Sequence, residues 1–307
     1  MKVFIHNVNS FLGEQRFPHS EVKDFEQRRR EYGLPDMPHM MGWHNLHRTS
    51  GDALSLAEHV IEKVLFESSA AQDVDHLIVC SSRFSGDFMQ GNDRLDEMMN
   101  RCAIGNVPVT GLTLSGCNSL FNGLQLASAM IESSKAQKVL LVAADVSADE
   151  TKRFDKNCMF SDAASAAILT STEPSSLVLL DTFCGFGRST GNASFFRGDL
   201  PAISNQLIRM LDKHGLQYSD LAKVITPNFY LPVVNMLMNS LGLATSLRFF
   251  GQSTLMAHCF ASDYFMAIEE IAAVQACTDE YYLLLGYADL HQGIGLIRKS
   301  AYREVSP

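Results

Sequence analysis

Apolar residues along the chain follow two periods, one typical of helices and one typical of buried strands. In 53–66 and again after position 117 they return every three or four residues, which predicts helices over 53–66 and 117–134. The runs 138–143 and 163–169 are instead short, continuously apolar and bounded by residues that break regular structure. Such runs are typical of strands whose two faces are both covered. The pattern predicts an α/β protein with a buried sheet.

The same order of elements returns in the second half of the chain. A long helix over 261–276 leads into a strand over 281–285, and a strand over 295–298 follows. These three elements match the helix and the two strands of the first half in order. A repeated unit that packs a buried helix against an apolar sheet predicts a five-layered α/β/α/β/α sandwich. Its two halves would be residues 1–170 and 171–307.

Weaker patterns predict the remaining elements of both halves. Strands are expected over 3–8, 77–80, 176–183 and 223–226. Helices are expected over 94–101, 203–214 and 232–241. The stretch around Met37, Met40 and Met41 contains two prolines and is expected to be an irregular loop.

Composition and charge narrow the class of protein. The chain has 307 residues, of which 46% are hydrophobic, so it can bury a large core. It has no apolar run long enough to cross a bilayer and no basic-then-apolar leader. The net charge of -9 argues against nucleic acid as the main partner. Seven cysteines without a paired or zinc-like spacing predict a reduced cytoplasmic protein without a structural metal.

Cys117 lies between a short apolar strand, predicted over 112–114, and the helix that follows. Unpaired backbone N–H groups and the positive end of a helix dipole converge at such a junction, and they favour the thiolate over the thiol. Small residues at Ser115, Gly116 and Ser119 would let a substrate approach the sulfur closely. The alternative is a core thiol, since free cysteine is among the most buried residue types. Only residues from elsewhere in the sequence that could act together with Cys117 can distinguish a catalytic thiol from a core thiol.

Three segments together resemble the thiolase superfamily, and most closely its β-ketoacyl-acyl-carrier-protein synthase III branch. They are Gly116–Cys117 before a buried helix, KVLLVAADV at 138–146, and MFSDAASAAIL at 159–169. In that family the third segment usually reads FGDGAGA. The chain keeps the aspartate as Asp162 but differs from the family at Ser161 and at 163–165. The resemblance extends over nearly the whole chain and implies the five-layered fold.

The resemblance also implies substrate-binding residues and a dimer. Trp43 with Arg48 and Thr49 is similar to the family's Trp-x-x-x-Arg-Thr, which clamps the adenine of coenzyme A, although one extra residue intervenes here. A segment like Phe88-Met89-Gln90 lies at the subunit interface in the family and contributes to the neighbour's pocket. The chain is therefore expected to be a homodimer whose sheet continues across the two-fold axis.

Two catalytic positions of the family differ in this chain. The family's His after a Val-Pro is matched by Asn228, and its Asn before the last long helix is matched by His258. His258 is the best-placed imidazole to act as base or imidazolium toward Cys117, whereas a helix-capping or core histidine is the alternative. Asn228 could donate to a thioester carbonyl or hold the imidazole, or it could be a turn residue after proline. Asp289, in an altered C-terminal turn, could orient His258 or be merely solvated.

The exchanged pair implies a changed reaction. We expect an acyltransferase that loads an acyl group from a carrier-protein or coenzyme A thioester onto Cys117. It would then pass the group to an oxygen, nitrogen or carbon nucleophile, in secondary metabolism or specialised lipid synthesis. No bound cofactor is implied, because the thioester arrives as substrate. Two alternatives stay open: a decarboxylative condensing enzyme that forms a carbon–carbon bond, and a non-catalytic partner subunit of a heterodimer.

Overall fold

The computed structural model of the chain describes residues 1–66, 73–84, 88–147, 149–187 and 200–301. Nine of the strands in this described part form one sheet, in the order β5-β4-β6-β7-β1-β8-β11-β10-β9. The first half of the chain supplies β1 (Val3–Leu12), β4 (His76–Cys80), β5 (Val109–Leu112), β6 (Lys138–Asp145) and β7 (Ala163–Thr170). The second half supplies β8 (Leu177–Phe186), β9 (Leu221–Ile225), β10 (Glu280–Ala288) and β11 (His291–Lys299).

Strand pairing repeats between the two parts of this sheet. In the first part β6 pairs in parallel with β4 and antiparallel with β7, which pairs antiparallel with β1. In the second part β10 pairs in parallel with β9 and antiparallel with β11, which pairs antiparallel with β8. The two parts meet where β1 pairs with β8, with Val3 opposite Leu179. The internal repeat expected from the order of elements is therefore present.

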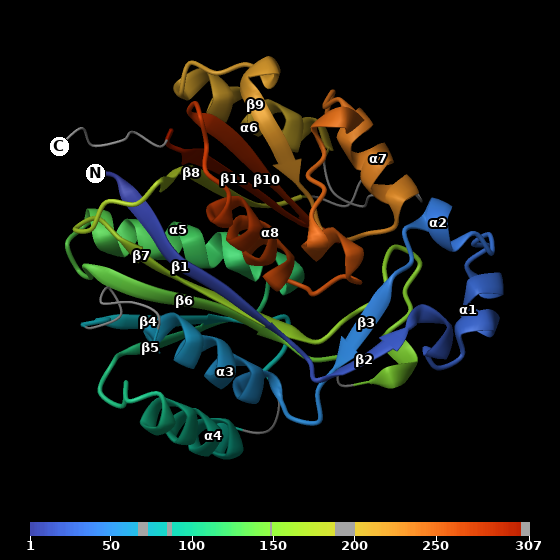
Figure 1. Ribbon diagram of the computed structural model, residues 1–307, viewed down its shortest axis with the longest axis horizontal. Coiled ribbons are helices and arrows are strands. Elements are labelled where there is room, and N and C mark those ends of the chain that lie inside the picture. Colours follow the sequence, from blue (N-terminus) through green and yellow to red (C-terminus); the bar gives the residue numbers. More distant parts are fainter. Residues whose placement is uncertain (67–72, 85–87, 148, 188–199, 302–307) are drawn as a thin grey trace.

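Helices cover both faces of each part, which gives five layers. The α-helices are α1 (Phe25–Glu31), α2 (Pro38–Met41), α3 (Ala53–Phe66), α4 (Phe88–Arg101), α5 (Ser119–Glu132), α6 (Leu200–Lys213), α7 (Leu231–Ser240) and α8 (Ser262–Ala273). In Figure 1, α5 and α8 lie between the two parts of the sheet, α3 and α4 cover one outer face, and α6 and α7 lie on the opposite side. The predicted sandwich is confirmed.

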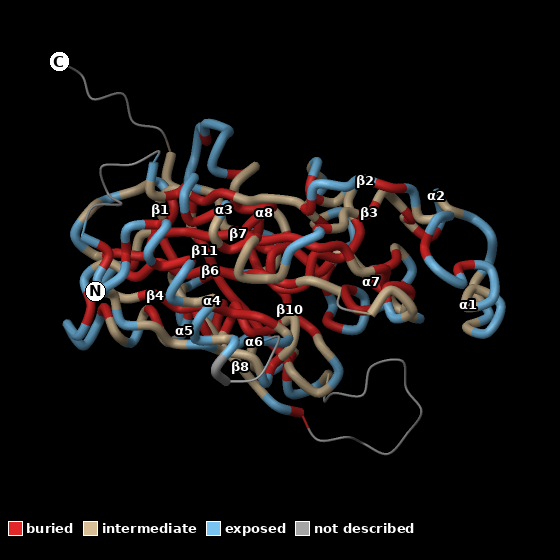
Figure 2. Tube along the Cα trace, turned by 90° about the horizontal axis from the view of Figure 1, so that it is seen from below, coloured by how far each residue is buried: buried red, intermediate tan, exposed pale blue. Residues whose placement is uncertain are grey.

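Three separate groups of buried side chains correspond to this layering. One lies under α3, one joins α5 and α8 to the inner faces of both parts of the sheet, and one lies under α6 and α7. The buried residues accordingly run through the middle of the molecule in Figure 2. All eight residues of β7 are buried, as expected for a continuously apolar strand with both faces covered.

The middle layer is packed so closely that the strands beside it carry glycine. Phe121 on α5 makes an edge-on contact with Tyr264 on α8, with 4.8 Å between ring centroids. A methyl group at Gly286 or Gly293 would collide with the Phe121 ring. Only glycine lets β10 and β11 pass this ring, which lies four residues beyond Cys117. The path of the hairpin beside Cys117 is thereby fixed.

Some predicted elements differ from the observed ones. The strand expected over 112–114 lies at Val109–Leu112, and Leu114 is exposed. The helix expected from position 94 begins at Phe88. Within the expected methionine loop, residues 38–41 form the short helix α2, with proline at its first position where no backbone N–H is needed. The small hairpin of β2 (Gln15–Pro18) and β3 (Asn45–Arg48) was not predicted, because 26 residues separate its strands.

No helix in the described part of the chain is both long and apolar enough to span a membrane.

Candidate active site

Cys117 lies in a short 3-10 turn, Gly116–Asn118, that connects β5 to the first turn of α5. The chain enters this turn through Gly116, whose φ of 56° is readily adopted only by glycine. Cys117 is half-buried, whereas Cys80, Cys102, Cys158 and Cys259 are buried. Its place ahead of α5 puts the sulfur in the field of the helix N-terminus, as the sequence predicted.

A cavity of about 320 Å³ opens beside Cys117. Its lining residues come from both halves of the chain: Leu114, Ser115, Gly116, Cys117, Asp155, Asn157, Cys158, Phe160, Phe229, His258, Ala288, Asp289 and His291. Cys117 and His258 therefore face one cavity, although 141 positions separate them in the sequence. The expected pairing of a cysteine with an imidazole has a geometric basis in this shared cavity.

Backbone pairing holds His258 in place. Its N–H donates to the carbonyl of Met159 at 2.8 Å, and its own carbonyl accepts from the N–H of Ser161 at 2.9 Å. The residue is fully buried just before α8 begins. The segment that leads into β7 therefore helps to position the imidazole, together with the loop that contains His258.

Asp263, in the first turn of α8, binds the imidazole of His258. The carboxylate Oδ2 lies 2.5 Å from Nδ1 of His258, and both side chains are buried. With Nδ1 held in this way, Nε2 is left without a hydrogen-bond partner among the described residues. Burial alone would lower the pKa of His258, but the Asp263 carboxylate and the Cys117 sulfur outweigh it and raise the pKa to about 10. The site thus favours the imidazolium form of His258 over the neutral imidazole.

Three phenylalanine rings surround this imidazolium. The ring centroid of His258 lies 5.1 Å from that of Phe229, 5.6 Å from that of Phe160 and 5.8 Å from that of Phe260. Aromatic rings exclude water and attract a cation through their quadrupole. They therefore make the interaction between His258 and Asp263 stronger than it would be in water.

Asn228 contacts Asp263 and does not line the cavity around Cys117. Its backbone N–H donates to Oδ2 of Asp263 at 2.8 Å. Its amide Nδ2 donates to Oδ1 of Asp263 at 3.2 Å and to the carbonyl of Ser253 at 2.8 Å. Both amide hydrogens are engaged, so Asn228 positions the carboxylate and the predicted direct role toward a thioester carbonyl is not supported by its contacts.

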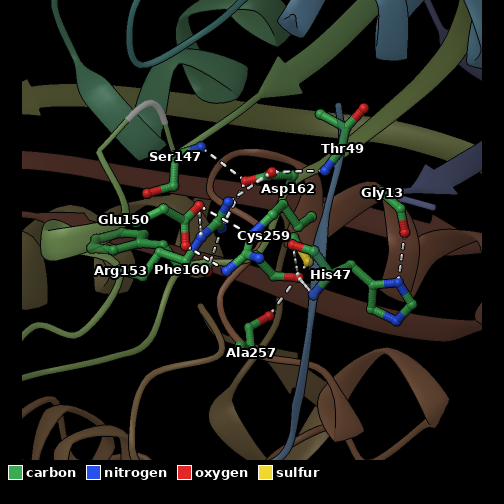
Figure 3. Close-up of polar contacts among 12 residues, drawn as sticks. Gly13, His47, Thr49, Ser147, Glu150, Arg153, Phe160, Asp162, Ala257 and Cys259 are labelled. Carbon is green, nitrogen blue, oxygen red and sulfur yellow. Dashed lines mark hydrogen bonds and ion pairs between the residues drawn. The ribbon is translucent and has the colours of Figure 1, made fainter. Parts of the chain in front are cut away.

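The segment 159–161, which pairs with His258, is anchored by a buried ion pair between Arg153 and Asp162 (Figure 3). The two side chains are joined by two parallel hydrogen bonds of 2.8 and 2.9 Å and are almost fully buried. Asp162 also accepts from the backbone N–H of Thr49 at 3.0 Å and of Ser147 at 2.8 Å. The carboxylate therefore ties together three loops and the start of β7. Ser161, its neighbour, is the residue that pairs with His258.

The remaining predicted site residues lie in different surroundings. Asp289 lines the cavity, but the carboxylate bound to His258 is that of Asp263, which corrects the suggestion that Asp289 orients it. Trp43 is buried among Phe25, Phe154 and Tyr230, so neither face of its ring is open to an adenine.

Arg48 is likewise engaged within the protein. It makes a two-pronged ion pair with Glu150, and its guanidinium stacks over the Phe17 ring. The arrangement does not support the predicted adenine clamp. Phe88 is the first residue of α4, and its side chain lies outside the described residues.

Sequence reasoning did not identify Asp263. The available signal was its place five residues after His258 and in the first turn of the predicted helix 261–276, where a carboxylate is favoured by the helix dipole. A helix-stabilising role is enough to explain an aspartate at this position, so nothing in the sequence pointed to a role for Asp263 in the site.

Comparisons with known proteins agree with this architecture. A family model described as 3-oxoacyl-[acyl-carrier-protein (ACP)] synthase III matches residues 113–185, which include Cys117 and Asp162. No curated protein matches the chain significantly. A solved structure described as "ChlB3 [Aceyltransferase]" is similar over 98% of this chain and 98% of its own, with a TM-score of 0.78 and 19% identity.

Two further solved structures show the same fold. 3-Oxoacyl-(acyl carrier protein) synthase III from Pseudomonas aeruginosa PAO1 matches 98% of this chain and 99% of its own, with a TM-score of 0.73 and 19% identity. Xanthomonas campestris OleA with bound lauric acid and lauroyl-CoA matches 97% and 98%, with a TM-score of 0.72 and 12% identity. The chain thus has the fold of the synthase III-like proteins of the thiolase superfamily.

Removing one member of the buried ion pair should destabilise the protein strongly. We expect Arg153→Met to lower the free energy of unfolding by roughly 3–5 kcal/mol, because it leaves the Asp162 charge buried without its partner. Lys152→Met, at the exposed neighbouring position, should change it by less than about 0.5 kcal/mol. The midpoints of urea unfolding compare the two variants, and equal midpoints would contradict the anchoring role.

The pH dependence of the site should follow Asp263. In the wild type the charged imidazolium of His258 stabilises the fold below its unfolded pKa of 6.5, and this contribution is lost as pH rises through about 10. Asp263→Asn removes the carboxylate that raises this pKa, so the pH at which His258 loses its proton should become much lower. The rate of alkylation of Cys117 by iodoacetamide, followed by mass spectrometry from pH 5 to 10.5, reports the shift. An unchanged profile would refute the assignment, and Asp220→Asn, an exposed residue outside the cavity, is the control.

Proposed function

We propose that the protein is an acyltransferase in which Cys117, His258 and Asp263 act together. The observation that carries this proposal is the orientation of the imidazole. Asp263 holds Nδ1, whereas Nε2 forms no hydrogen bond of regular geometry within the described part of the chain, and the residue shares its cavity with Cys117, whose side chain helps to raise the pKa of the imidazole. This is the arrangement in which an oriented imidazole serves a nucleophile. The fold it shares with a solved acyltransferase agrees with the proposal.

In the first half of the reaction the acyl group is loaded. The Cys117 thiolate, paired with the imidazolium, attacks the carbonyl carbon of an acyl thioester. When the tetrahedral intermediate collapses, the carbon–sulfur bond of the donor breaks and the departing thiolate takes the proton from Nε2 of His258. The products are acyl-Cys117, a neutral imidazole and the free thiol of the donor.

In the second half the acceptor receives the acyl group. Acylation removes the negative charge on Cys117, which is one cause of the raised pKa of His258, so the imidazole is a base at this stage. It takes the proton from the acceptor as the acceptor attacks the thioester. The carbon–sulfur bond then breaks, and the Cys117 thiolate and the imidazolium are restored. Asp263 stabilises the imidazolium in both halves.

Decarboxylative condensation is the second candidate, and two features of the site disfavour it. Asp155 and Asp289 line the cavity, so a malonyl group would meet two carboxylates there against the one imidazolium of His258. Asn228, the amide expected to help polarise the thioester, is bound to Asp263. We therefore propose transfer to an oxygen or nitrogen nucleophile, in secondary-metabolite or specialised lipid synthesis.

The donor is proposed to be an acyl carrier protein in preference to coenzyme A. Trp43 is buried and Arg48 is paired with Glu150, so the two residues expected to clamp an adenine are engaged within the protein. Phosphopantetheine on a carrier protein presents the same thioester without an adenine. The similar structures include a 3-oxoacyl-(acyl carrier protein) synthase III and OleA with bound lauroyl-CoA.

Acylation of Cys117 tests the enzyme proposal. We expect an acyl mass adduct on the intact protein after incubation with acyl thioesters, mapped to Cys117 and absent in Cys117→Ala. His258→Ala should slow the loading roughly a hundred- to ten-thousand-fold, the range of general acid–base contributions. Label on another cysteine, or none with carrier-protein, coenzyme A and N-acetylcysteamine donors, would favour a non-catalytic partner subunit. Malonyl donors should load more slowly than uncharged donors of similar length.

We also propose that the protein is a homodimer joined along β5. This strand lies at one end of the sheet, so one of its edges has no partner strand in the described part of the chain. A cavity of about 640 Å³ lies beside it, lined in part by Phe84, Val109 and Gly111. An obligate interface on the order of 2,000 Å² or more is expected. A stable, active monomer in sedimentation velocity at micromolar concentration would contradict this.

A further inference from the structure

Arg248 is a buried arginine whose charge has no anionic partner among the described residues. It follows the short 3-10 turn Thr245–Leu247, and only 6% of its surface is exposed. Its guanidinium stacks on the ring of Phe250, 4.8 Å from the centroid, and its Nε is buried without a hydrogen-bond partner. Burial lowers the pKa of Arg248, and no described carboxylate offsets this effect. Arg153, which is also buried, instead binds two carboxylates. A buried ion needs a partner of opposite charge, so Arg248 points to an anionic ligand.

Three histidines lie near this guanidinium. Burial is the largest cause of the lowered pKa of His44, and the charge of Arg248 is the next, followed by those of His19 and His39. Charges affect one another in this way only over a short distance. The ring of His19 also lies 5.6 Å, centroid to centroid, from that of Trp43, which directly precedes His44. Four basic side chains from separate segments are therefore gathered in one place.

The charge of this cluster is positive. Burial lowers the pKa of His19, and the exposed carboxylate of Asp36 partly offsets this effect. A single exposed carboxylate is well screened by water and salt, whereas the guanidinium of Arg248 is buried. The cluster therefore attracts anions, although the whole chain has a net charge of -9.

Helix packing and backbone pairing fix the positions of these groups. The helix α2, which precedes His44, packs against α7 (Figure 1). The N–H of Phe249, the residue after the guanidinium, donates to the carbonyl of Val224 on β9 at 2.8 Å. On the other side of the cluster, the N–H of Ala257 donates to the carbonyl of Asn45 at 3.1 Å. The donors are thus held in place by the fold.

We propose that Arg248, His44, His19 and His39 form a binding site for a phosphate group. A guanidinium binds phosphate through two parallel N–H···O bonds, and imidazole N–H groups donate to its remaining oxygens. None of the four residues lines the cavity around Cys117, so this site is separate from the candidate active site. A free phosphate ion and the phosphate ester of a phosphopantetheine donor are two sources of the group. The site itself does not rest on the proposed acyl transfer.

Titration of the wild type with inorganic phosphate tests the site directly. We expect the melting temperature to rise by about 2–4 °C when phosphate reaches on the order of ten times its dissociation constant, because the ligand binds only the folded protein. Isothermal titration calorimetry should show one saturable site. Acetate at the same ionic strength has one charge and two oxygens, so its effect should be smaller. Absence of saturable phosphate binding would overturn the proposal.

The variant Arg248→Met distinguishes a ligand-binding arginine from a structural one. In phosphate-free buffer it should melt at the wild-type temperature or higher, because it removes a buried charge that has no partner. The saturable effect of phosphate should disappear, and any rise that remains is the general stabilisation by phosphate salts. Arg209→Met, at an exposed position of α6, should keep the saturable effect. A variant that binds phosphate like the wild type would refute the role of Arg248.

The variant His44→Ala tests the contribution of the imidazoles. Loss of one hydrogen bond to a charged group should weaken phosphate binding on the order of tenfold. Unchanged affinity would remove His44 from the site. If a substituted protein fails to fold, the titration of the wild type still decides whether phosphate binds.

Phosphopantetheine and pantetheine separate the two sources of the phosphate group. They share the same chain, but only phosphopantetheine carries a phosphate. Binding that depends on Arg248 and is roughly tenfold tighter than that of inorganic phosphate would assign the site to the donor, and equal or weaker binding would assign it to the free ion. Equal affinity of the two compounds, together with no binding of inorganic phosphate, would refute the site. Acylation of Cys117 is measured separately, so the proposed function can fail without this site, and the site without the function.

Discussion

The ion pair between Arg153 and Asp162 is the interaction on which the site depends. Two ions taken out of water lose several kcal/mol of hydration each, which is recovered only with near-ideal geometry and further hydrogen bonds. Asp162 meets this condition through Arg153 and two backbone N–H groups, and Arg153 through Asp162, Glu150 and the carbonyl of Phe160. The cost of misplacing any of these groups keeps the surrounding loops in one arrangement. Ser161 lies between Phe160 and Asp162, and its backbone pairs with that of His258. The position of the imidazole therefore depends on an ion pair that lies outside the cavity.

His258 and Asp263 form a second buried charged unit, and the two units serve different purposes. The carboxylate of Asp162 accepts from two backbone N–H groups and from the permanently charged guanidinium of Arg153. Asp263 instead binds an imidazole that can change its charge, and the other imidazole nitrogen is left without a protein partner among the described residues. Asn228 and the backbone of Cys259 keep Asp263 in place while that charge changes. A rigid pair next to a titratable pair gives the protein a precise scaffold and a movable proton in one small region.

The sequence predicted the features that depend on local pattern. Helical spacing and continuous apolar runs located α5, α8, β6 and β7, and the break between strand and helix placed Cys117 correctly. The contacts that define the chemistry join segments that are distant in the sequence. Which of several possible partners each polar side chain binds cannot be read from the spacing of apolar residues. Three roles were open for Asn228, toward a thioester carbonyl, toward the imidazole or as a turn residue, and its amide in fact donates to the nearby Asp263. Trp43 was expected to clamp an adenine, but it packs against Phe25, Phe154 and Tyr230, which come from three separate segments. Asp162 was recognised by resemblance, whereas its partner Arg153 had no signal in the sequence.

The position of β1 has a consequence for how the chain folds. This first strand lies between β7 and β8, with Phe4 opposite both Thr170 and Val178. During synthesis its hydrogen-bonding edges must wait until β7 (Ala163–Thr170) and β8 (Leu177–Phe186), far along the chain, have left the ribosome. Contacts of such large sequence separation slow folding, and the apolar residues of the waiting strand are exposed meanwhile. The two halves resemble independent repeats in their pairing pattern, yet the first cannot complete its connection to the second until the start of β8 emerges. We therefore expect the central sheet to close after translation of the second half has begun, and early nascent chains to depend on chaperones.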